Sequence, residues 1–148
     1  MALTAPESLK REHEELHADL VAATKAGGKT GLAAQAVAQA LHPHFVKEEE
    51  YAMPPLGLLV QIARGEVPPD SGAVIAMTDK LKQDIGHMLH EHKAIVVQLH
   101  RLMEEARNER RDEYIHLAER ILMHARTEEE VLYPAAILIG EYLKLKKG

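Results

Sequence analysis

Residues 44–54 read HFVKEEEYAMP, and residues 124–134 read HARTEEEVLYP. Both stretches follow the pattern His-x-x-x-Glu-Glu-Glu-x-x-x-Pro, and the second copy begins 80 residues after the first. A histidine and a glutamate four residues apart lie on one face of an α-helix, one turn above the other. The repeat therefore predicts two similar helices, each of which carries a His-Glu pair and ends at a proline.

A Glu-His dipeptide precedes each copy of this motif, at residues 12–13 and at residues 91–92. The single histidine lies 31 residues before the motif histidine in the first half and 32 residues before it in the second. The helical pattern between the single histidine and the motif histidine is interrupted in each half, by two glycines at positions 27–28 in the first and by the polar stretch 108–112 in the second. Each half of the chain is therefore expected to form a helical hairpin.

The composition supports a helical core. Hydrophobic residues make up 46% of the 148 residues but aromatic residues only 3%, whereas sheets usually contain more aromatic and β-branched side chains. The prediction is a single all-α domain over residues 1–148, an up-down-up-down four-helix bundle with a short C-terminal helix. Its expected parts are hairpin 1 (about 5–53), a proline-rich connection (54–70), hairpin 2 (about 71–134) and a C-terminal segment (135–148).

Several classes of function are disfavoured by composition. The net charge is −5 with both signs mixed, and few aromatic rings are available for base stacking, so no nucleic-acid partner is expected. Without cysteine the chain forms neither disulfides nor thiolate metal sites. No apolar run approaches the roughly 20 residues of a membrane helix, and no signal peptide is evident. We expect a cytoplasmic protein, and the sequence leaves its oligomeric state open.

The positions of the histidines point to a metal site. His13 lies about 15 residues before the first turn and His44 about 16 residues after it, so both are ~23 Å from the turn and should face each other. His92 and His124 should do the same in the second hairpin. Packing of the hairpins then places four imidazoles and two carboxylates in one layer: His13, His44, Glu48, His92, His124 and Glu128.

Six ionisable groups in an apolar core are costly unless something pairs them. Four imidazoles and two carboxylates suit two divalent ions about 3.5–4 Å apart, and these ligand types suit Fe, Mn or Zn. Because no sulfur ligand is present, iron is the first choice. The alternative is that the histidines are hydrogen-bonded core residues and the glutamate runs are solvated faces. Recurrence of the pattern at matched heights argues for metal.

These motifs resemble the hemerythrin-like family, also called the HHE cation-binding domain, over about residues 5–134. The resemblance implies an up-down-up-down bundle with two iron ions joined by an oxo or hydroxo bridge, and manganese or zinc are possible occupants. It implies that Glu48 and Glu128 bridge the ions. The ligands that it implies are His13, His44, Glu48, His92, His124 and Glu128.

The sequence also departs from the oxygen-carrying members, which have a His-x-x-x-His pair on the third helix. Here Met88 and Val96 lie four residues from His92. Such a pair occurs on the first helix instead, where His17 could be a fifth ligand or a plain core or surface histidine. Tyr51 and Tyr114 could support the metal or simply pack. We expect the remaining histidines at the surface: His42, His87, His90, His100 and His116.

The favoured function is a non-haem di-iron protein that binds or senses O₂, NO or peroxide at the metal centre. One alternative is an iron-handling or regulatory metal-binding module. Another is a di-iron oxidase or peroxide-consuming enzyme, so the sequence leaves open whether the protein is an enzyme. A third alternative is a helical interaction domain that binds no metal.

Overall fold

The structure is a computed structural model that describes residues 3–69 and 71–147. Within these ranges the chain is almost entirely helical and contains no strand, so the all-α class is confirmed. Residue 70, at the end of the predicted connection, and residue 148 lie outside the described residues. The four long helices are α1 (Glu7–Thr24), α2 (Gly28–Lys47), α4 (Gly72–Asn108) and α5 (Asp112–Thr127).

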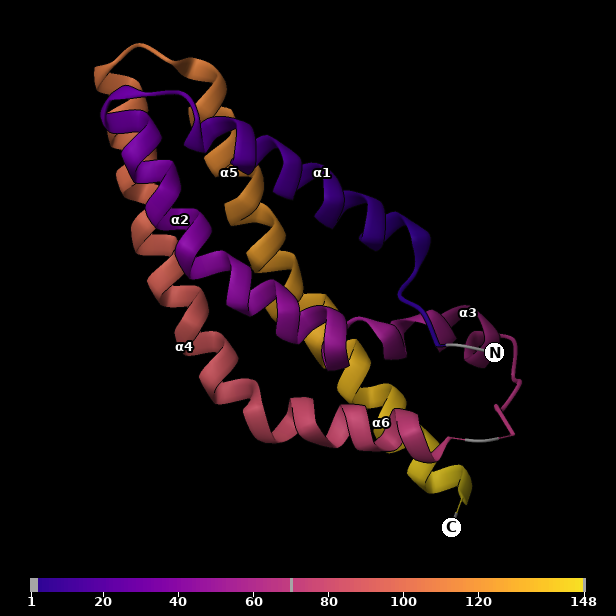
Figure 1. The fold of residues 1–148 in the computed structure, drawn as a ribbon. Helices are drawn as coiled ribbons and strands as arrows, with labels where there is room; N and C mark the ends of the chain where they lie inside the picture. Colours follow the sequence, from indigo (N-terminus) through magenta and orange to yellow (C-terminus); the bar gives the residue numbers. More distant parts are fainter. Residues whose placement is uncertain (1–2, 70, 148) are drawn as a thin grey trace.

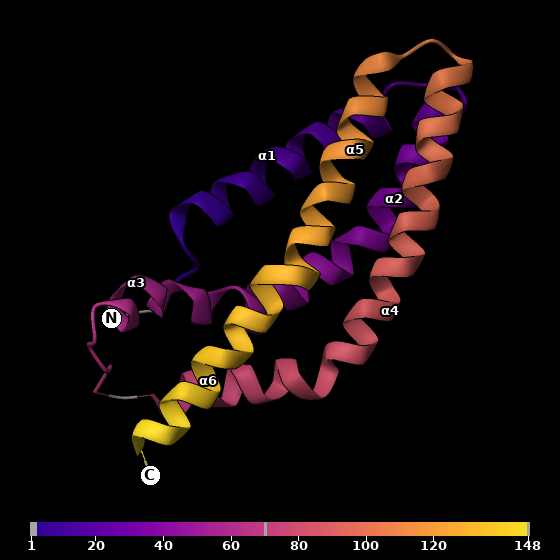
Figure 2. The same cartoon turned by 180° about the vertical axis from the view of Figure 1, so that it is seen from behind.

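The long helices pack in a ring. Helix α1 contacts α2 and α5, and α4 contacts the same two helices from the other side. The turn between α1 and α2 lies beside the turn between α4 and α5 in both views (Figures 1 and 2). The described part of the chain has no helix that combines the length and apolar character needed to span a bilayer.

The opposite end of the molecule is built from shorter elements. The chain leaves α2 through a π-helical turn, η1 (Glu48–Ala52), and a 3₁₀ turn, η2 (Pro54–Leu58), before the short helix α3 (Leu59–Ala63). Helix α6 (Tyr133–Lys147) packs against α4 there (Figure 1). The contact is close, because a side chain at Gly140 would overlap the hydroxyl of Thr78.

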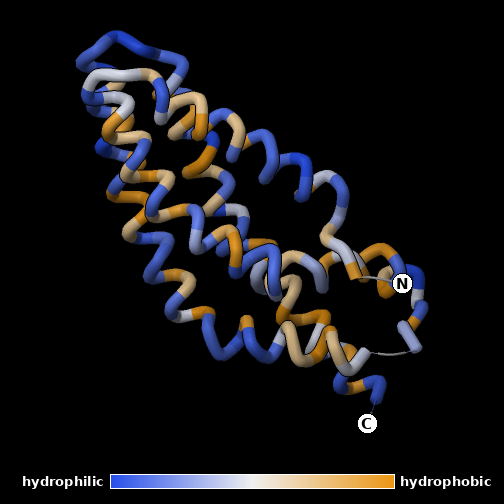
Figure 3. Tube along the Cα trace, in the orientation of Figure 1, coloured by the Kyte–Doolittle hydropathy of each residue, from blue (hydrophilic) through white to orange (hydrophobic). Residues whose placement is uncertain are grey.

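Apolar side chains form two buried clusters, and the predicted site residues lie between them. One cluster contains Leu41 and Ile121 on the side of the turns, and the other contains Tyr51 and Met88 on the side of α6. Along α2 and η1, His44 and Glu48 separate Leu41 from Tyr51. Figure 3 shows that apolar and polar residues alternate along all four long helices, as expected for amphipathic bundle helices.

The prediction that Pro134 ends the fourth helix is wrong. Helix α5 continues through a second π-helical turn, η3 (Glu128–Leu132), directly into α6. A proline lacks an N–H and clashes with the carbonyl four residues earlier in an α-helix. In η3 the Tyr133 N–H donates to the Glu128 carbonyl five residues back, so the widened turn accommodates Pro134. The separate C-terminal helix that we expected is therefore an extension of the fourth helix.

The two hairpins also hold each other at the end with the turns. The Glu109 carboxylate, just after α4, accepts hydrogen bonds from the backbone N–H groups of Lys29 (3.2 Å) and Thr30 (2.8 Å) in the first turn of α2. Arg111 donates to the carbonyl of Ala26 at 2.7 Å, beyond the end of α1. Because these partners satisfy groups that helix ends leave unpaired, the second hairpin caps the helix ends of the first. The hydrogen bonds from the Thr30 side chain and backbone lower the pKa of Glu109.

We expect Glu109→Ala to lower the thermal midpoint of the metal-free protein at neutral pH, because α2 loses its cap. Since the pKa of Glu109 is lower in the folded state, its stabilisation is complete above the ordinary glutamate pKa of about 4.3 and is lost as pH falls through the folded value. Thermal melts of wild type and variant should therefore converge in acid. The exposed Glu104→Ala is the control, and a difference that persists unchanged in acid would contradict this role.

Candidate metal centre

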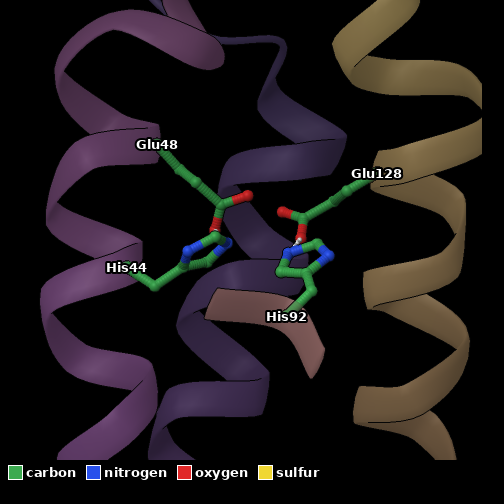
Figure 4. Close-up of side chains that lie close together, drawn as sticks. All are labelled: His44, Glu48, His92 and Glu128. Atoms are coloured by element: carbon green, nitrogen blue, oxygen red, sulfur yellow. Dashed lines mark ion pairs between the residues drawn. The ribbon is translucent and has the colours of Figure 1, made fainter. Parts of the chain in front are cut away.

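The structure brings the predicted ligands together in two groups, which share one residue. The inner group contains His44, Glu48, His92 and Glu128, and the outer group contains His13, His124 and Glu128. In each group the candidate ligand atoms all lie within 4.8 Å of one another, and all the side chains are buried. Figure 4 shows the inner group, in which the two carboxylates approach each other above the two imidazoles.

All four long helices contribute to these groups. His13 comes from α1, His44 from α2, His92 from α4 and His124 from α5. Glu48 and Glu128 are the first residues of the two π turns. The inner side chains are 0–2% exposed, whereas His13 and His124 are 5% and 6% exposed. The six positions therefore converge as the sequence indicates, and their role as metal ligands stays a prediction.

The histidines pair differently from our expectation. His44 lies against His92, with ring centroids 4.5 Å apart, and His13 lies against His124 at 4.7 Å. Both pairs join the two hairpins, whereas the heights along the helices predicted pairs within each hairpin. The number of residues between a side chain and the turn fixes its depth in the bundle. It does not decide which of two neighbouring helices that side chain faces.

Glu128 lies between the two groups and presents one oxygen to each. Its Oε1 is 3.2 Å from His92 Nε2 in the inner group. Its Oε2 is 3.1 Å from His124 Nε2 and 3.5 Å from His13 Nε2 in the outer group. This is the arrangement that a bridging carboxylate requires. Glu48, the other predicted bridge, belongs to the inner group alone.

A second set of carboxylates orients the imidazoles. Glu91 contacts Nδ1 of His44 at 3.2 Å, Glu129 contacts Nδ1 of His92 at 2.9 Å, and Glu12 contacts Nδ1 of His124. A proton on Nδ1, held by a carboxylate, leaves the lone pair of Nε2 directed into the group, as in many metal sites. The glutamates of the two Glu-His dipeptides therefore each orient a histidine of the opposite hairpin.

Burial and neighbouring charges shift the pKa values of these carboxyl groups and histidines in different directions. Burial and the charge of Glu128 raise the pKa of Glu48 well above its usual range. Burial alone would raise the pKa of Glu128 too, but the Glu48 carboxyl and the surrounding histidines hold it well below its usual range. Burial lowers the pKa of His44, whereas Glu128 outweighs burial and raises the pKa of His92 and that of His124. The pKa values of the two buried carboxyl groups are therefore shifted in opposite directions, as are those of the two inner histidines.

One atom of the inner group shows that protons alone do not satisfy it. Among the described residues, Glu48 Oε1 is the buried side-chain atom without a hydrogen-bond partner, and His44 Nε2 lies 3.8 Å away. A buried acceptor left unpaired is costly, and native proteins rarely contain one. A cation between the imidazoles and carboxylates would satisfy it. The residues present therefore fit a metal ion, and their nitrogen and oxygen atoms suit iron, manganese or zinc.

The other candidates from the sequence lie away from both groups. His17 is exposed and faces His42 with ring centroids 6.4 Å apart, so it is not placed as a fifth ligand. Tyr51 donates to Asp84, and Tyr114 lies under the guanidinium of Arg111. The prediction of a surface location is confirmed for His42, His87, His90, His100 and His116, all of which are exposed.

Sequence reasoning missed Tyr133. Its hydroxyl donates to Glu48 Oε2 at 2.8 Å, and it lies 3.0 Å from His44 Nε2 and 3.2 Å from His92 Nε2. The residue directly precedes Pro134, which we interpreted as the end of the helix. The position five residues after Glu128 was the available signal, because a π turn aligns residues at that spacing.

The outer group borders a pocket of about 360 Å³. The pocket reaches His13 and is lined mainly by apolar side chains of the N-terminal segment, of α1 and of the chain after η1, including Leu9, Met53 and Pro54. Lys10, Glu14 and Glu49 add charge to its wall. A small uncharged molecule can therefore approach the outer group through this pocket.

Comparisons of the chain with protein-family models, with curated proteins and with solved structures find no match. What the chain does must therefore be inferred from its own residues.

Proposed function

We propose that this chain is a hemerythrin-like protein with an up-down-up-down bundle that holds two metal ions and binds or senses a small molecule there. The observation that carries the proposal is the position of Glu128, whose two oxygens face two separate groups of buried imidazoles. Iron is the preferred occupant, because the ligands are imidazole and carboxylate without sulfur. When bound, iron supplies a redox-active centre that can accept O₂, NO or peroxide.

The two groups differ in the number of candidate ligands and in how deeply those ligands are buried. Four side chains surround the inner position, and all are 0–2% exposed. Within the described ranges three candidate ligands surround the outer position, and three protein ligands leave room for an exogenous one. Since the outer group also borders the pocket at His13, we assign the small molecule to the outer position. The apolar lining favours uncharged ligands such as O₂ and NO.

An iron-handling or regulatory module is the second candidate. It is favoured by the burial of both glutamates and four histidines in a single layer, because such a layer links metal occupancy to folding. In that case the occupied and empty forms would differ in stability more than in ligand binding.

Metal analysis of the purified chain and titration of the metal-free chain with ferrous iron test the proposal. We expect saturation near two ions per chain, and NO added to the ferrous protein should change its absorption spectrum. Iron binding without any response to NO would favour the second candidate. Absence of stoichiometric metal binding would overturn both.

We expect Leu9→Trp to slow the binding of NO severalfold without changing the metal content, because the larger ring fills the pocket beside His13. Stopped-flow absorption of the ferrous protein measures the rate. Leu32→Trp is the matched control, since Leu32 is 65% exposed and lies at the end of the bundle with the turns. An unchanged rate in Leu9→Trp would exclude this pocket as the route.

A further inference from the structure

We infer that Tyr133 is a fifth protein ligand of the inner ion, through its phenol oxygen. The inference rests on the proposed function, because it requires that the inner group hold a metal. It concerns a residue that the motif does not include, and it makes the two metal positions chemically different.

The phenol oxygen lies among all four members of the inner group. It is 2.8 Å from Glu48 Oε2 and 3.5 Å from Glu128 Oε1. It is 3.0 Å from the Nε2 atom of His44 and 3.2 Å from that of His92. These four atoms come from four different side chains, on α2, η1, α4 and η3, so the oxygen lies beside every candidate donor of the group. A cation bound by the same four side chains would therefore contact the phenol oxygen.

The tyrosine ring has little freedom to leave this position. Tyr133 is 0% exposed and belongs to the buried cluster that also contains Met88 and Leu81. Its ring lies 5.6 Å from the ring of His92, between centroids. Metal–nitrogen and metal–oxygen bonds are about 2.0–2.2 Å long, so two donors at a right angle on one ion lie about 3 Å apart. The phenol oxygen lies 2.8–3.5 Å from the four other donor atoms, so these separations are already close to those within one coordination sphere. Expelling a buried ring from a packed core would require a much larger rearrangement.

The π turn η3 is what directs Tyr133 to the group. In an α-helix, a residue five positions after Glu128 would lie about 140° around the axis from it. In η3 the Tyr133 N–H bonds to the Glu128 carbonyl, five residues earlier, so the two residues lie on nearly the same face. π turns within α-helices occur frequently at functional sites. The widened turn thus adds an oxygen donor to the histidine and glutamate of the motif.

Only one half of the repeat provides this donor. The residue that corresponds to Tyr133 in the first copy is Met53, which lines the pocket beside His13. The inner ion would have five protein ligands and the outer ion three. An anionic phenol oxygen stabilises ferric iron over ferrous iron, so the inner ion should be the harder one to reduce. Exchange of small molecules is then left to the outer ion.

The optical spectrum of the ferric protein tests the inference. Metal-free protein is loaded with ferrous iron under anaerobic conditions and oxidised with ferricyanide, and its visible absorption and resonance Raman spectra are recorded. We expect a phenolate-to-iron(III) charge-transfer band in the wild type, with tyrosine ring vibrations enhanced under it. Tyr133→Phe should abolish the band while the chain still binds iron through its other ligands. If the variant does not fold, absence of enhanced tyrosine vibrations in the wild type still overturns the inference, and their persistence in Tyr51→Phe supports it.

Tyr51→Phe is the matched control, because Tyr51 is also buried (3% exposed) but its hydroxyl donates to Asp84. This variant should keep the band. Iron-loaded wild type without a phenolate band, or a band that survives Tyr133→Phe, would overturn the role of Tyr133 and leave the proposed function intact. A wild type that binds no iron would overturn the proposed function itself.

Discussion

Glu128→Gln is expected to abolish tight binding at both metal positions, whereas Glu48→Gln should weaken only the inner one. Glutamine preserves the shape of the side chain but removes the negative charge that faces both groups of imidazoles. Loss of an outer-shell partner already costs roughly 10–100-fold in metal affinity, and loss of a shared ligand should cost more at each position. Metal content after gel filtration and iron titration followed by absorption measure the effect.

Glu130→Gln is the control for this experiment. Glu130 belongs to the same run of three glutamates, but it is exposed and pairs with Arg126 at 3.1 Å. Its replacement should leave the stoichiometry unchanged. Equal losses in Glu48→Gln and Glu128→Gln would show that both carboxylates bridge, as the family resemblance implies. Full metal content in Glu128→Gln would contradict the shared role of that residue.

Removal of the metal is expected to lower the thermal midpoint strongly. A ligand present at about 1,000 times its dissociation constant stabilises the folded state by about 4 kcal/mol. For a chain of this size each kcal/mol corresponds to about 2–4 °C, so the expected decrease is about 8–16 °C for one tightly held ion. Circular dichroism melts with chelator, and again after ferrous iron is restored, measure this shift.

The same melts on Glu128→Gln provide the internal comparison. Because this variant should hold neither ion tightly, chelator should hardly change its midpoint. If the wild type melts at one temperature with and without chelator, metal is not part of its folded state, and the second candidate function fails as well.

The repeated motif made most of the helical framework predictable. Histidine and glutamate recur at one spacing on two helices, and the glycines at positions 27–28 mark the first turn, so the four long helices follow from local pattern alone. The depth of the site was predictable for the same reason, since it depends only on the number of residues from each turn. The exposure of the remaining histidines followed from their lack of repeat partners.

Features set by tertiary packing were not predictable in this way. Each motif ends in a proline, but only Pro54 lies at an end of the helix, since η1 ends at Ala52 whereas α6 continues through Pro134. There a second proline and Gly57 follow, whereas two alanines follow Pro134 and allow the helix to continue. The π turns depend on a change of hydrogen-bond partner that no local residue preference specifies, and Tyr133 was missed with them. Which helix each histidine faces depends on how the hairpins rotate against each other.

The distribution of ligands between the hairpins has a consequence for assembly. Each group takes side chains from both hairpins, and Glu12 and Glu91 steady imidazoles across the same boundary. Either half of the chain, cut away from the other, would lack a complete chelating set. If the two groups bind metal as proposed, tight binding should follow the docking of the two halves, and the absorption of the iron-loaded protein would then report the final stage of folding.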